Sequence, residues 1–201
     1  MTDAFDNPAF WNCAYAGASL DVGPAPAVAV HPLLAEDLAG RPPGTGLELA
    51  CGEGRPAIAL ARAGWRMTAV DFSTVAIGRG RRIADVLGVR VDWVVADVTA
   101  YAPEPQLDVV LVGYLHLPPD ALDAVLARAA GALAPGGSVL VVGWDRTSAS
   151  GPTHRYDAPA LAARIAAAIP ELEIRRADTL PRPGDPTAYD AVVHLSRSAA
   201  P

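Results

Sequence analysis

The sequence contains no lysine, so arginine supplies the positive side-chain charge at neutral pH. Its 16 basic residues are outnumbered by 22 acidic ones, which gives a net charge of −6, and they form no basic cluster. A nucleic-acid backbone is bound through a concentrated positive face. The composition therefore predicts no nucleic-acid partner, and small molecules are the expected ligands.

The sequence has only two cysteines, Cys13 and Cys51, and neither lies in a CxxC or Cys/His pattern. Two are too few for a disulfide framework, and this spacing predicts no metal site. Apolar runs long enough to span a bilayer are also missing, and the first residues lack the pattern of a signal peptide. We therefore expect no membrane partner and a cytoplasmic protein.

Strand and helix patterns alternate along the 201 residues, a length that one domain accommodates. Strands are expected at 46–50, 66–70, 89–95, 107–112, 138–142, 172–176 and 189–196. Helices are expected at 8–17, 32–38, 56–63, 73–87, 118–133 and 158–168. The alternation predicts an α/β fold with a parallel sheet and helices on both faces. The last two strands have the pattern of a hairpin, so the final strand is expected to be antiparallel.

An apolar run that begins at Gly46 breaks at a glycine turn and resumes with helical spacing up to Leu60. This pattern predicts a strand, a tight loop and a helix. Gly52 and Gly54 let the backbone approach a ligand closely, and the amides at the start of the helix favour a carboxylate or a phosphate. The loop is therefore a predicted cofactor-binding site.

Acidic residues near this loop narrow the choice of cofactor. The spacing Gly52-x-Gly54-x-x-Ala57 also fits the dinucleotide fingerprint, so the glycines alone do not choose. Asp71 ends the next strand, where an acid can accept both ribose hydroxyls, and Asp97 ends the one after, where an acid can meet the adenine amino group. With Glu48 inside the first strand, these acids favour S-adenosylmethionine over a nicotinamide cofactor.

The series Glu48-x-Ala50-x-Gly52-x-Gly54, Asp71, Asp97, 107–110 and 133–137 resembles the class I S-adenosylmethionine-dependent methyltransferases, over about residues 10–197. Within that class, the segments 10–16 and 114–119 resemble the small tellurite-resistance and thiopurine methyltransferases. One departure is Ala50, which stands where the family's loop has its first glycine. Its methyl group is expected to tilt the cofactor slightly without excluding it.

The resemblance implies a Rossmann-like doubly wound sheet of seven strands with an antiparallel last strand, in a single domain, 1–201. That domain would comprise a helical lid at 1–40, a cofactor-binding core at 45–145 and a C-terminal helix and hairpin at 146–201. It implies methyl transfer from S-adenosylmethionine, leaving S-adenosylhomocysteine, to an oxygen, nitrogen, sulfur or chalcogen atom of a small-molecule acceptor. The cofactor-binding residues that it implies are Trp11, Tyr15, Glu48, Ala50, Cys51, Gly52, Gly54, Arg55, Asp71, Phe72, Ser73, Asp97, Val98 and Tyr114. The acceptor atom and the oligomeric state are left open.

Three aromatic residues, Phe10, Trp11 and Tyr15, recur at helical spacing near the start of the chain. They could form a hydrophobic staple that packs the first helix onto the core. They could also belong to a lid whose ring faces meet the sulfonium, since a cation is attracted to an aromatic face. The two interpretations are compatible.

His116 is the candidate catalytic base, because it follows the fourth strand and its unperturbed pKa lies near neutrality. A base is needed only if the acceptor arrives protonated; the alternative is that His116 bonds the backbone or shapes the pocket. The predicted substrate-binding residues are Tyr114, His116, Trp144, Arg146 and His154. Arg146 would favour an anionic acceptor. Cys51 is not expected to be a nucleophile, because the methyl group already has its own leaving group.

Two alternative functions remain open at this point. A nicotinamide-dependent oxidoreductase fits the glycine spacing, but a Tyr-x-x-x-Lys pair is impossible without lysine. A non-catalytic S-adenosylmethionine-binding module would be consistent with Ala50 and with the helix weakened by Gly78 and Gly80. Close packing on the sheet is the only reason the sequence offers for these two glycines.

Overall fold

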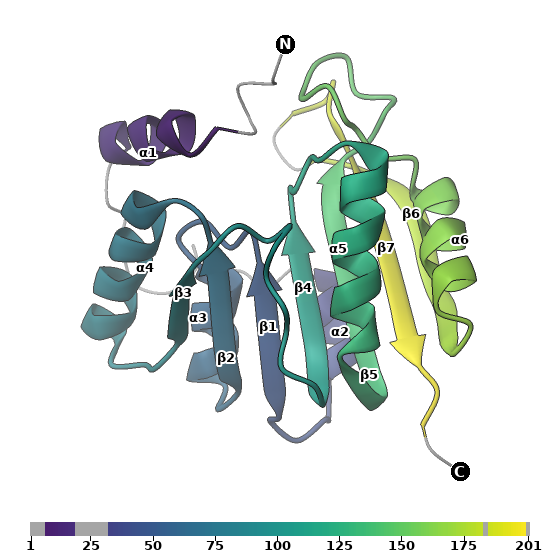
Figure 1. Ribbon diagram of the computed structural model, residues 1–201, viewed down its shortest axis with the longest axis horizontal. Helices are drawn as coiled ribbons and strands as arrows, with labels where there is room; N and C mark the ends of the chain where they lie inside the picture. The colour runs from purple at the N-terminus through teal and green to yellow at the C-terminus, as the bar shows by residue number, and fades with distance from the viewer. Residues whose placement is uncertain (1–6, 19–31, 183–184, 200–201) are drawn as a thin grey trace. The chain divides into compact units, whose positions relative to one another are not determined.

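The computed structural model describes residues 7–18, 32–182 and 185–199. The chain forms two compact units, residues 1–100 and 101–201. Each unit contains parallel strands with helices packed beside them (Figure 1).

The first unit is built on three parallel strands in the order β3-β2-β1. Its strands are β1 (Thr45–Leu49), β2 (Arg66–Asp71) and β3 (Asp92–Val95), and its helices are α1 (Pro8–Gly17), α2 (Pro32–Leu38), α3 (Arg55–Arg62) and α4 (Thr74–Leu87). Most residues of β1 and β2 are buried, as expected of parallel strands covered on both faces. The ends of these strands position the glycine turn and Asp71.

Helix α4 begins and ends at well-defined caps. The Ser73 side chain accepts a hydrogen bond from the Ala76 amide, and Gly88 ends the helix in the left-handed conformation. Gly80 lies on its buried face, where a Cβ atom would be 2.5 Å from the Trp93 ring and 2.6 Å from the Glu53 carbonyl oxygen. Close packing therefore requires Gly80, whereas a Cβ atom on Gly78 would meet no atom within 4 Å.

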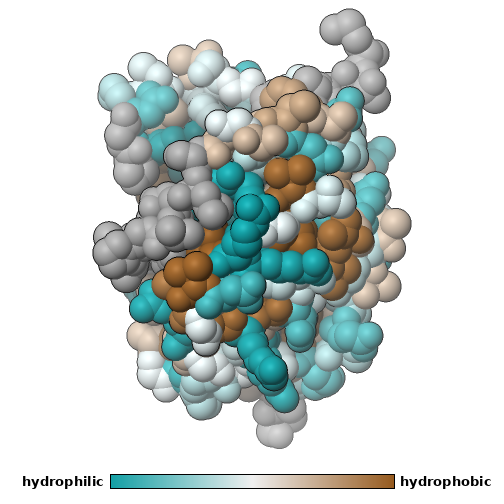
Figure 2. All heavy atoms as spheres, turned by 90° about the vertical axis from the view of Figure 1, so that its left-hand side faces the viewer, coloured by the Kyte–Doolittle hydropathy of each residue, from teal (hydrophilic) through white to brown (hydrophobic). Residues whose placement is uncertain are grey.

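The outer side of the first unit is exposed to solvent. In α4, Val86 is 66% exposed, and in α1 Phe10 is 40% exposed. Figure 2, which views the molecule from the side where these two helices lie in Figure 1, shows hydrophobic side chains in separate groups among hydrophilic ones. The apolar stripe of α4 thus faces the sheet, and its other face meets water.

The second unit contains four strands in the order β4-β5-β7-β6. Its strands are β4 (Leu107–Gly113), β5 (Leu133–Trp144), β6 (Leu172–Pro181) and β7 (Tyr189–Arg197), and its helices are α5 (Pro119–Gly131) and α6 (Ala158–Ala168). Strands β4 and β5 are parallel, and β7 is antiparallel to both β5 and β6. The predicted seven-stranded sheet with an antiparallel last strand is confirmed.

Three strands have bounds that differ from the prediction by more than one residue. Strand β6 continues to Pro181 instead of ending at residue 176. Strand β3 begins at Asp92 instead of residue 89. Strand β5 begins at Leu133 instead of residue 138, because Leu107 already pairs with Leu133 and a register shift accommodates the turn before Val109 pairs with Ser138. Pairing with β4 on both sides of this irregularity therefore extends β5 to residue 133.

Candidate functional site

The loop after β1 contains three residues with positive φ. These are Ala50 at +53°, Gly52 at +55° and Gly54 at +64°. Gly54 forms the N-cap of α3 without a side-chain cap. Glycine adopts this conformation freely, whereas an L-alanine pays about 1–2 kcal/mol for it. The loop therefore keeps the path of a three-glycine turn although alanine holds its first position.

Asp71 holds this loop from the end of β2. Its Oδ2 accepts a hydrogen bond of 2.8 Å from the Gly52 amide, and its Oδ1 accepts one of 2.8 Å from the Ser73 amide. Burial raises the pKa of this carboxyl, while the two amide hydrogen bonds oppose that rise. Asp71 thus joins the glycine turn to the start of α4, and each oxygen keeps a second lone pair for a ligand.

Glu48 is buried beneath the same loop. Its Oε2 accepts a hydrogen bond of 2.8 Å from the Ala57 amide in the first turn of α3. Burial raises the pKa of Glu48 to about 8, so its carboxyl is largely protonated at neutral pH. In the structure Glu48 fastens β1 to α3.

Asp97, predicted to meet adenine, follows β3 and is exposed. Its Oδ1 accepts hydrogen bonds from the Thr99 amide at 2.8 Å and from the Thr99 hydroxyl at 2.7 Å. This turn fixes the carboxylate at the end of the strand. Nearby, Phe72 is half-buried and Val98 is buried.

The thiol of Cys51 lies inside the loop with its Sγ 3.5 Å from the Gly52 carbonyl oxygen. Burial raises its pKa well above the ordinary value, so the thiol stays protonated. A nucleophile needs the thiolate. The geometry thus agrees with the expectation that Cys51 is not a nucleophile.

Helix α1 packs against the first unit through polar contacts. Asn12 Oδ1 accepts a hydrogen bond of 2.7 Å from the Ser73 hydroxyl and one of 3.3 Å from the Val75 amide. The Tyr15 hydroxyl lies so close to Gly52 that a Cβ atom there would be 2.3 Å from it. Trp11 lies beside Tyr15, with ring centroids 6.0 Å apart. Of the two predicted lid residues, Tyr15 is therefore next to the glycine turn, and Trp11 lies on the same helix beside Tyr15.

An ion-pair network that sequence reasoning missed ties α1 and α4 to the loop. Glu53 pairs with Arg79 at 2.5 Å and with Arg55 at 2.9 Å, and the Arg79 Nη1 donates to the Ala18 carbonyl at 2.9 Å. Arg79 is 7% exposed. The sequence does place Arg79 beside the buried stripe of α4. This position could have predicted an acidic partner, because a buried arginine needs one.

Tyr114 and His116 follow β4 in the second unit. Tyr114 has a φ of +54° and its amide donates to the Val142 carbonyl at 2.7 Å. The His116 Nδ1 is 2.8 Å from the His154 carbonyl oxygen, which only accepts, so the proton is on Nδ1. The Nε2 accepts a long bond of 3.4 Å from the Trp144 amide. Burial lowers the pKa of His116, which favours the neutral ring.

Trp144 is the last residue of β5, and Arg146 lies two residues further on. Their surroundings differ. Arg146 pairs with Asp157 at 3.0 Å, and its side chain is 68% exposed. The arginine against the Trp144 ring is Arg182, whose guanidinium carbon is 3.7 Å from the ring centroid. Arg182 also donates a hydrogen bond to Asp190, and neither residue was predicted from the sequence.

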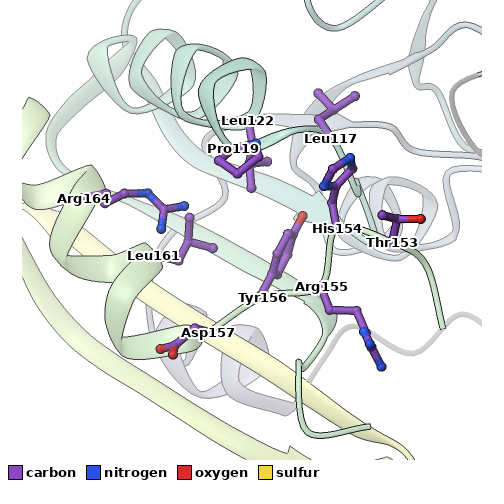
Figure 3. A pocket seen from close by; sticks show the side chains of 10 residues that line it. All are labelled: Leu117, Pro119, Leu122, Thr153, His154, Arg155, Tyr156, Asp157, Leu161 and Arg164. Carbon is purple, nitrogen blue, oxygen red and sulfur yellow. The ribbon is translucent and has the colours of Figure 1, made fainter. Parts of the chain in front are cut away.

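A pocket of about 210 Å³ lies in the second unit between α5, α6 and the loop before α6 (Figure 3). Its lining residues are Leu117, Pro119, Leu122, Thr153, His154, Arg155, Tyr156, Asp157, Leu161 and Arg164. The predicted substrate residue His154 is among them. Both arginines have partners, because Arg164 pairs with Asp123 at 2.9 Å and Arg155 donates to the Ser148 carbonyl at 2.7 Å.

Within the described ranges, three or more His, Cys, Asp or Glu side chains do not gather into a possible metal site. In the same part of the chain, none of the helices has the length and apolar character needed to span a bilayer.

Residues 47–137 match the family model of a methyltransferase domain. The predicted enzyme class, a class I S-adenosylmethionine-dependent methyltransferase, and its cofactor are confirmed. A search of curated protein sequences found no match.

Solved structures share the fold at low sequence identity. One, from work on the conversion of a disulfide bond into a thioacetal group during echinomycin biosynthesis, is 23% identical with a TM-score of 0.71, over 95% of this chain and 93% of that one. The 1,6-didemethyltoxoflavin-N1-methyltransferase of Burkholderia thailandensis is 23% identical with a TM-score of 0.67, over 92% and 81%. TehB of Haemophilus influenzae is 15% identical with a TM-score of 0.72, over 85% and 63%.

Proposed function

We propose that this chain, whose residues 47–137 carry a methyltransferase domain, methylates a small organic acceptor in the cytoplasm. The observation that carries the proposal is the pair of hydrogen bonds from Gly52 and Ser73 to Asp71. They hold an acid at the end of β2 beside a turn of positive φ. A carboxylate held there could accept hydrogen bonds from the ribose hydroxyls of a bound nucleoside, because each of its oxygens keeps a second lone pair.

The first unit would hold S-adenosylmethionine. The turn formed by Ala50, Gly52 and Gly54 lets the backbone approach the amino-acid part of the cofactor, while Asp71 accepts from the ribose and Asp97 from the adenine amino group. Tyr15, fixed over Gly52, would cover the bound cofactor from α1. Glu48 would support the cofactor site indirectly, because its carboxyl accepts a hydrogen bond from the start of α3 beneath the loop.

Residues of the second unit would contact the acceptor. Tyr114, His116 and Trp144 follow β4 and β5, and His154 lines the pocket beside α6. Arg146 is paired with Asp157, so part of its charge is already neutralised. It would therefore attract an anionic acceptor less strongly than the sequence predicted. The structure of 1,6-didemethyltoxoflavin-N1-methyltransferase holds 1,6-didemethyltoxoflavin and S-adenosylhomocysteine, which supports a small-molecule acceptor here.

The reaction needs little from the protein beyond position. A lone pair on the acceptor forms the new bond to the methyl carbon as the carbon–sulfur bond breaks, and the sulfonium becomes a neutral thioether. Alignment of the two reactants supplies about 7–11 kcal/mol in such reactions. When the acceptor carries a proton, His116 Nε2 is the atom proposed to remove it, because Nδ1 already carries a proton. To do so, Nε2 would give up the long bond of 3.4 Å that it accepts from the Trp144 amide.

Calorimetric titration of the purified protein with S-adenosylmethionine, S-adenosylhomocysteine and NAD tests the cofactor assignment. We expect micromolar binding of the first two and no binding of NAD. The reverse pattern would show that Asp71 serves a dinucleotide. Tight binding of S-adenosylmethionine without its consumption, across thiols, amines, phenols, carboxylates and chalcogen anions, would show a binding module instead of an enzyme.

A further inference from the structure

Arg182 fills a space bounded by two aromatic rings and a carboxylate. Its guanidinium carbon lies 3.7 Å from the ring centroid of Trp144 and 5.0 Å from that of Tyr114. Its Nε donates to Asp190 Oδ1 at 3.0 Å, and its Nη2 bonds the same oxygen. The Tyr114 hydroxyl donates to Asp190 Oδ2 at 3.1 Å. These contacts are those that aromatic cages make with organic cations.

The walls of this space are held by the sheet and do not depend on Arg182. Trp144 and Asp190 are register partners across β5 and β7. The Trp144 carbonyl accepts from the Tyr156 amide at 2.8 Å, and the Tyr114 amide is bonded to Val142. Arg182, by contrast, follows the end of β6 and reaches the cage with a long, flexible side chain. The backbone of all three wall residues is therefore fixed independently of Arg182, and the Arg182 side chain is the part that can leave.

The charge of the cage determines which ligand it suits. Arg182 and Asp190 neutralise each other, with side chains 18% and 8% exposed. An anion would have to displace Asp190 from Arg182, and the carboxylate cannot leave its strand. A cation has only to displace Arg182, after which it meets the same two rings and the same carboxylate.

We propose that Tyr114, Trp144 and Asp190 form a binding site for a positively charged ammonium or guanidinium group of the acceptor, with Arg182 as its internal occupant. This inference rests on the proposed methyltransferase function, which it refines by naming the substrate class. The charged group serves for recognition, and the methylated atom is elsewhere on the acceptor.

Methylguanidinium chloride, which copies the end of an arginine side chain, is the probe for this site. Calorimetric titration should show that Arg182→Ala binds it at least tenfold more tightly than the wild-type protein does. Arg176→Ala is the matched control, because Arg176 lies on β6 itself and, like Arg182, pairs with an aspartate, in this case Asp178 outside the cage. We expect this control to bind the probe as weakly as the wild type.

A second substitution identifies the site. Replacing Asp190 by Asn in the Arg182→Ala background should abolish the gain, and binding that survives this change would place the probe elsewhere and overturn the proposal. Equal binding by the wild type and Arg182→Ala would overturn it too. Should Arg182→Ala fail to fold, Arg182→Gln keeps the stem, loses the charge and should show a gain of the same direction.

S-adenosylmethionine is titrated into the same variants. This second titration distinguishes a failure of the proposed methyltransferase function from a failure of the proposed cation site. A cage that binds methylguanidinium in a protein that ignores S-adenosylmethionine would overturn the methyltransferase assignment and with it the role of the cage in acceptor binding. Cofactor binding without any gain in methylguanidinium affinity would overturn the cage alone.

Discussion

The carboxylate of Asp71 accepts a hydrogen bond from the Gly52 amide at 2.8 Å, across 19 residues of sequence. The ends of β1 and β2 are thereby locked together at the point where the cofactor is proposed to bind. The same carboxylate holds Ser73, which caps α4. One side chain thus organises the turn, the next helix and the ribose site.

Asp71→Ala should weaken S-adenosylmethionine binding by about 1.5–3 kcal/mol, the usual contribution of a hydrogen bond to a charged group. This corresponds to an affinity loss of about tenfold to a hundredfold, measured by calorimetry. Asp92→Ala, which removes an exposed acid from β3, is the control and should bind normally. Unchanged affinity in Asp71→Ala would overturn the ribose assignment.

The two glycines of α4 should respond in opposite directions to alanine. Gly80→Ala brings a methyl group against Trp93 and the Glu53 carbonyl, and overpacking of this kind costs about 1–3 kcal/mol. Gly78→Ala meets open space and should stabilise the helix by up to about 1 kcal/mol. Urea unfolding of both variants measures the difference. Equal effects would mean that Trp93 does not pack against Gly80.

Ala50→Gly should raise the free energy of unfolding by up to about 1 kcal/mol, because alanine is strained at a φ of +53°. S-adenosylmethionine affinity should stay the same or increase. Ala61→Gly, in the regular part of α3, is the matched control and should lose up to about 1 kcal/mol. A destabilised Ala50→Gly would show that the methyl group contributes packing that outweighs the strain.

Glu48→Gln should change how stability depends on pH. The folded pKa of about 8 lies above the ordinary 4.5, so the folded protein holds a proton that the unfolded chain releases. Glu48 therefore contributes to the free energy of unfolding below pH 4.5. This contribution is lost as the pH rises toward 8, by at most about 1.4 kcal/mol per pH unit. Glutamine cannot ionise and keeps an oxygen for the Ala57 amide. The Glu48→Gln variant should therefore lack this pH-dependent loss of stability.

Thermal or urea unfolding at several pH values measures this difference between wild type and Glu48→Gln. Glu104→Gln changes an exposed acid and should follow the wild-type profile. Parallel profiles for Glu48→Gln and the wild type would show that Glu48 ionises freely within the folded protein.

His116→Asn separates a catalytic base from a residue that only shapes the site. A base removes a proton from a phenol or an ammonium but has none to remove from a thiolate. Loss of the base should lower kcat about 10²- to 10⁴-fold for the protonated acceptor and leave a thiolate acceptor unaffected. Equal losses for both acceptor types would assign His116 a structural role.

The pH profile of the wild-type enzyme offers an independent check on His116. Burial lowers its pKa below the ordinary 6.5, so the neutral ring persists to lower pH. The acidic limb of kcat/KM for a protonated acceptor should therefore fall below pH 6.5. An acidic limb above that value would point to another group.

The sequence predicted the fold well because its signals are local. Apolar runs identified β1, β2 and β4, and the acids Asp71 and Asp97 were recognised because each comes at or just after the end of a strand. The start of β5 was misplaced because residues 135–137 have the composition of a turn, while pairing with β4 carries the strand through them. Local propensity is overridden where a neighbouring strand supplies hydrogen bonds.

The contacts of Arg182 could not be predicted in the same way. Arg182 meets Trp144, 38 residues earlier in the chain, only because β6 pairs with β7 and β7 pairs with β5, each in one particular register. Several registers of the hairpin would satisfy its hydrophobic pattern. Asn12 is similar, since a polar residue on an exposed helix gave no indication that it would bond Ser73.

Helix α1 contains no buried residue and is held by Asn12, Tyr15 and the bond from Arg79 to Ala18. Contacts of this kind open with far less free energy than a core helix requires, so amide hydrogens of α1 should exchange long before those of β1. If α1 covers the cofactor, its opening sets how long S-adenosylhomocysteine stays after each turnover. The overall rate at saturating substrate would then depend on a helix that takes no part in the chemistry.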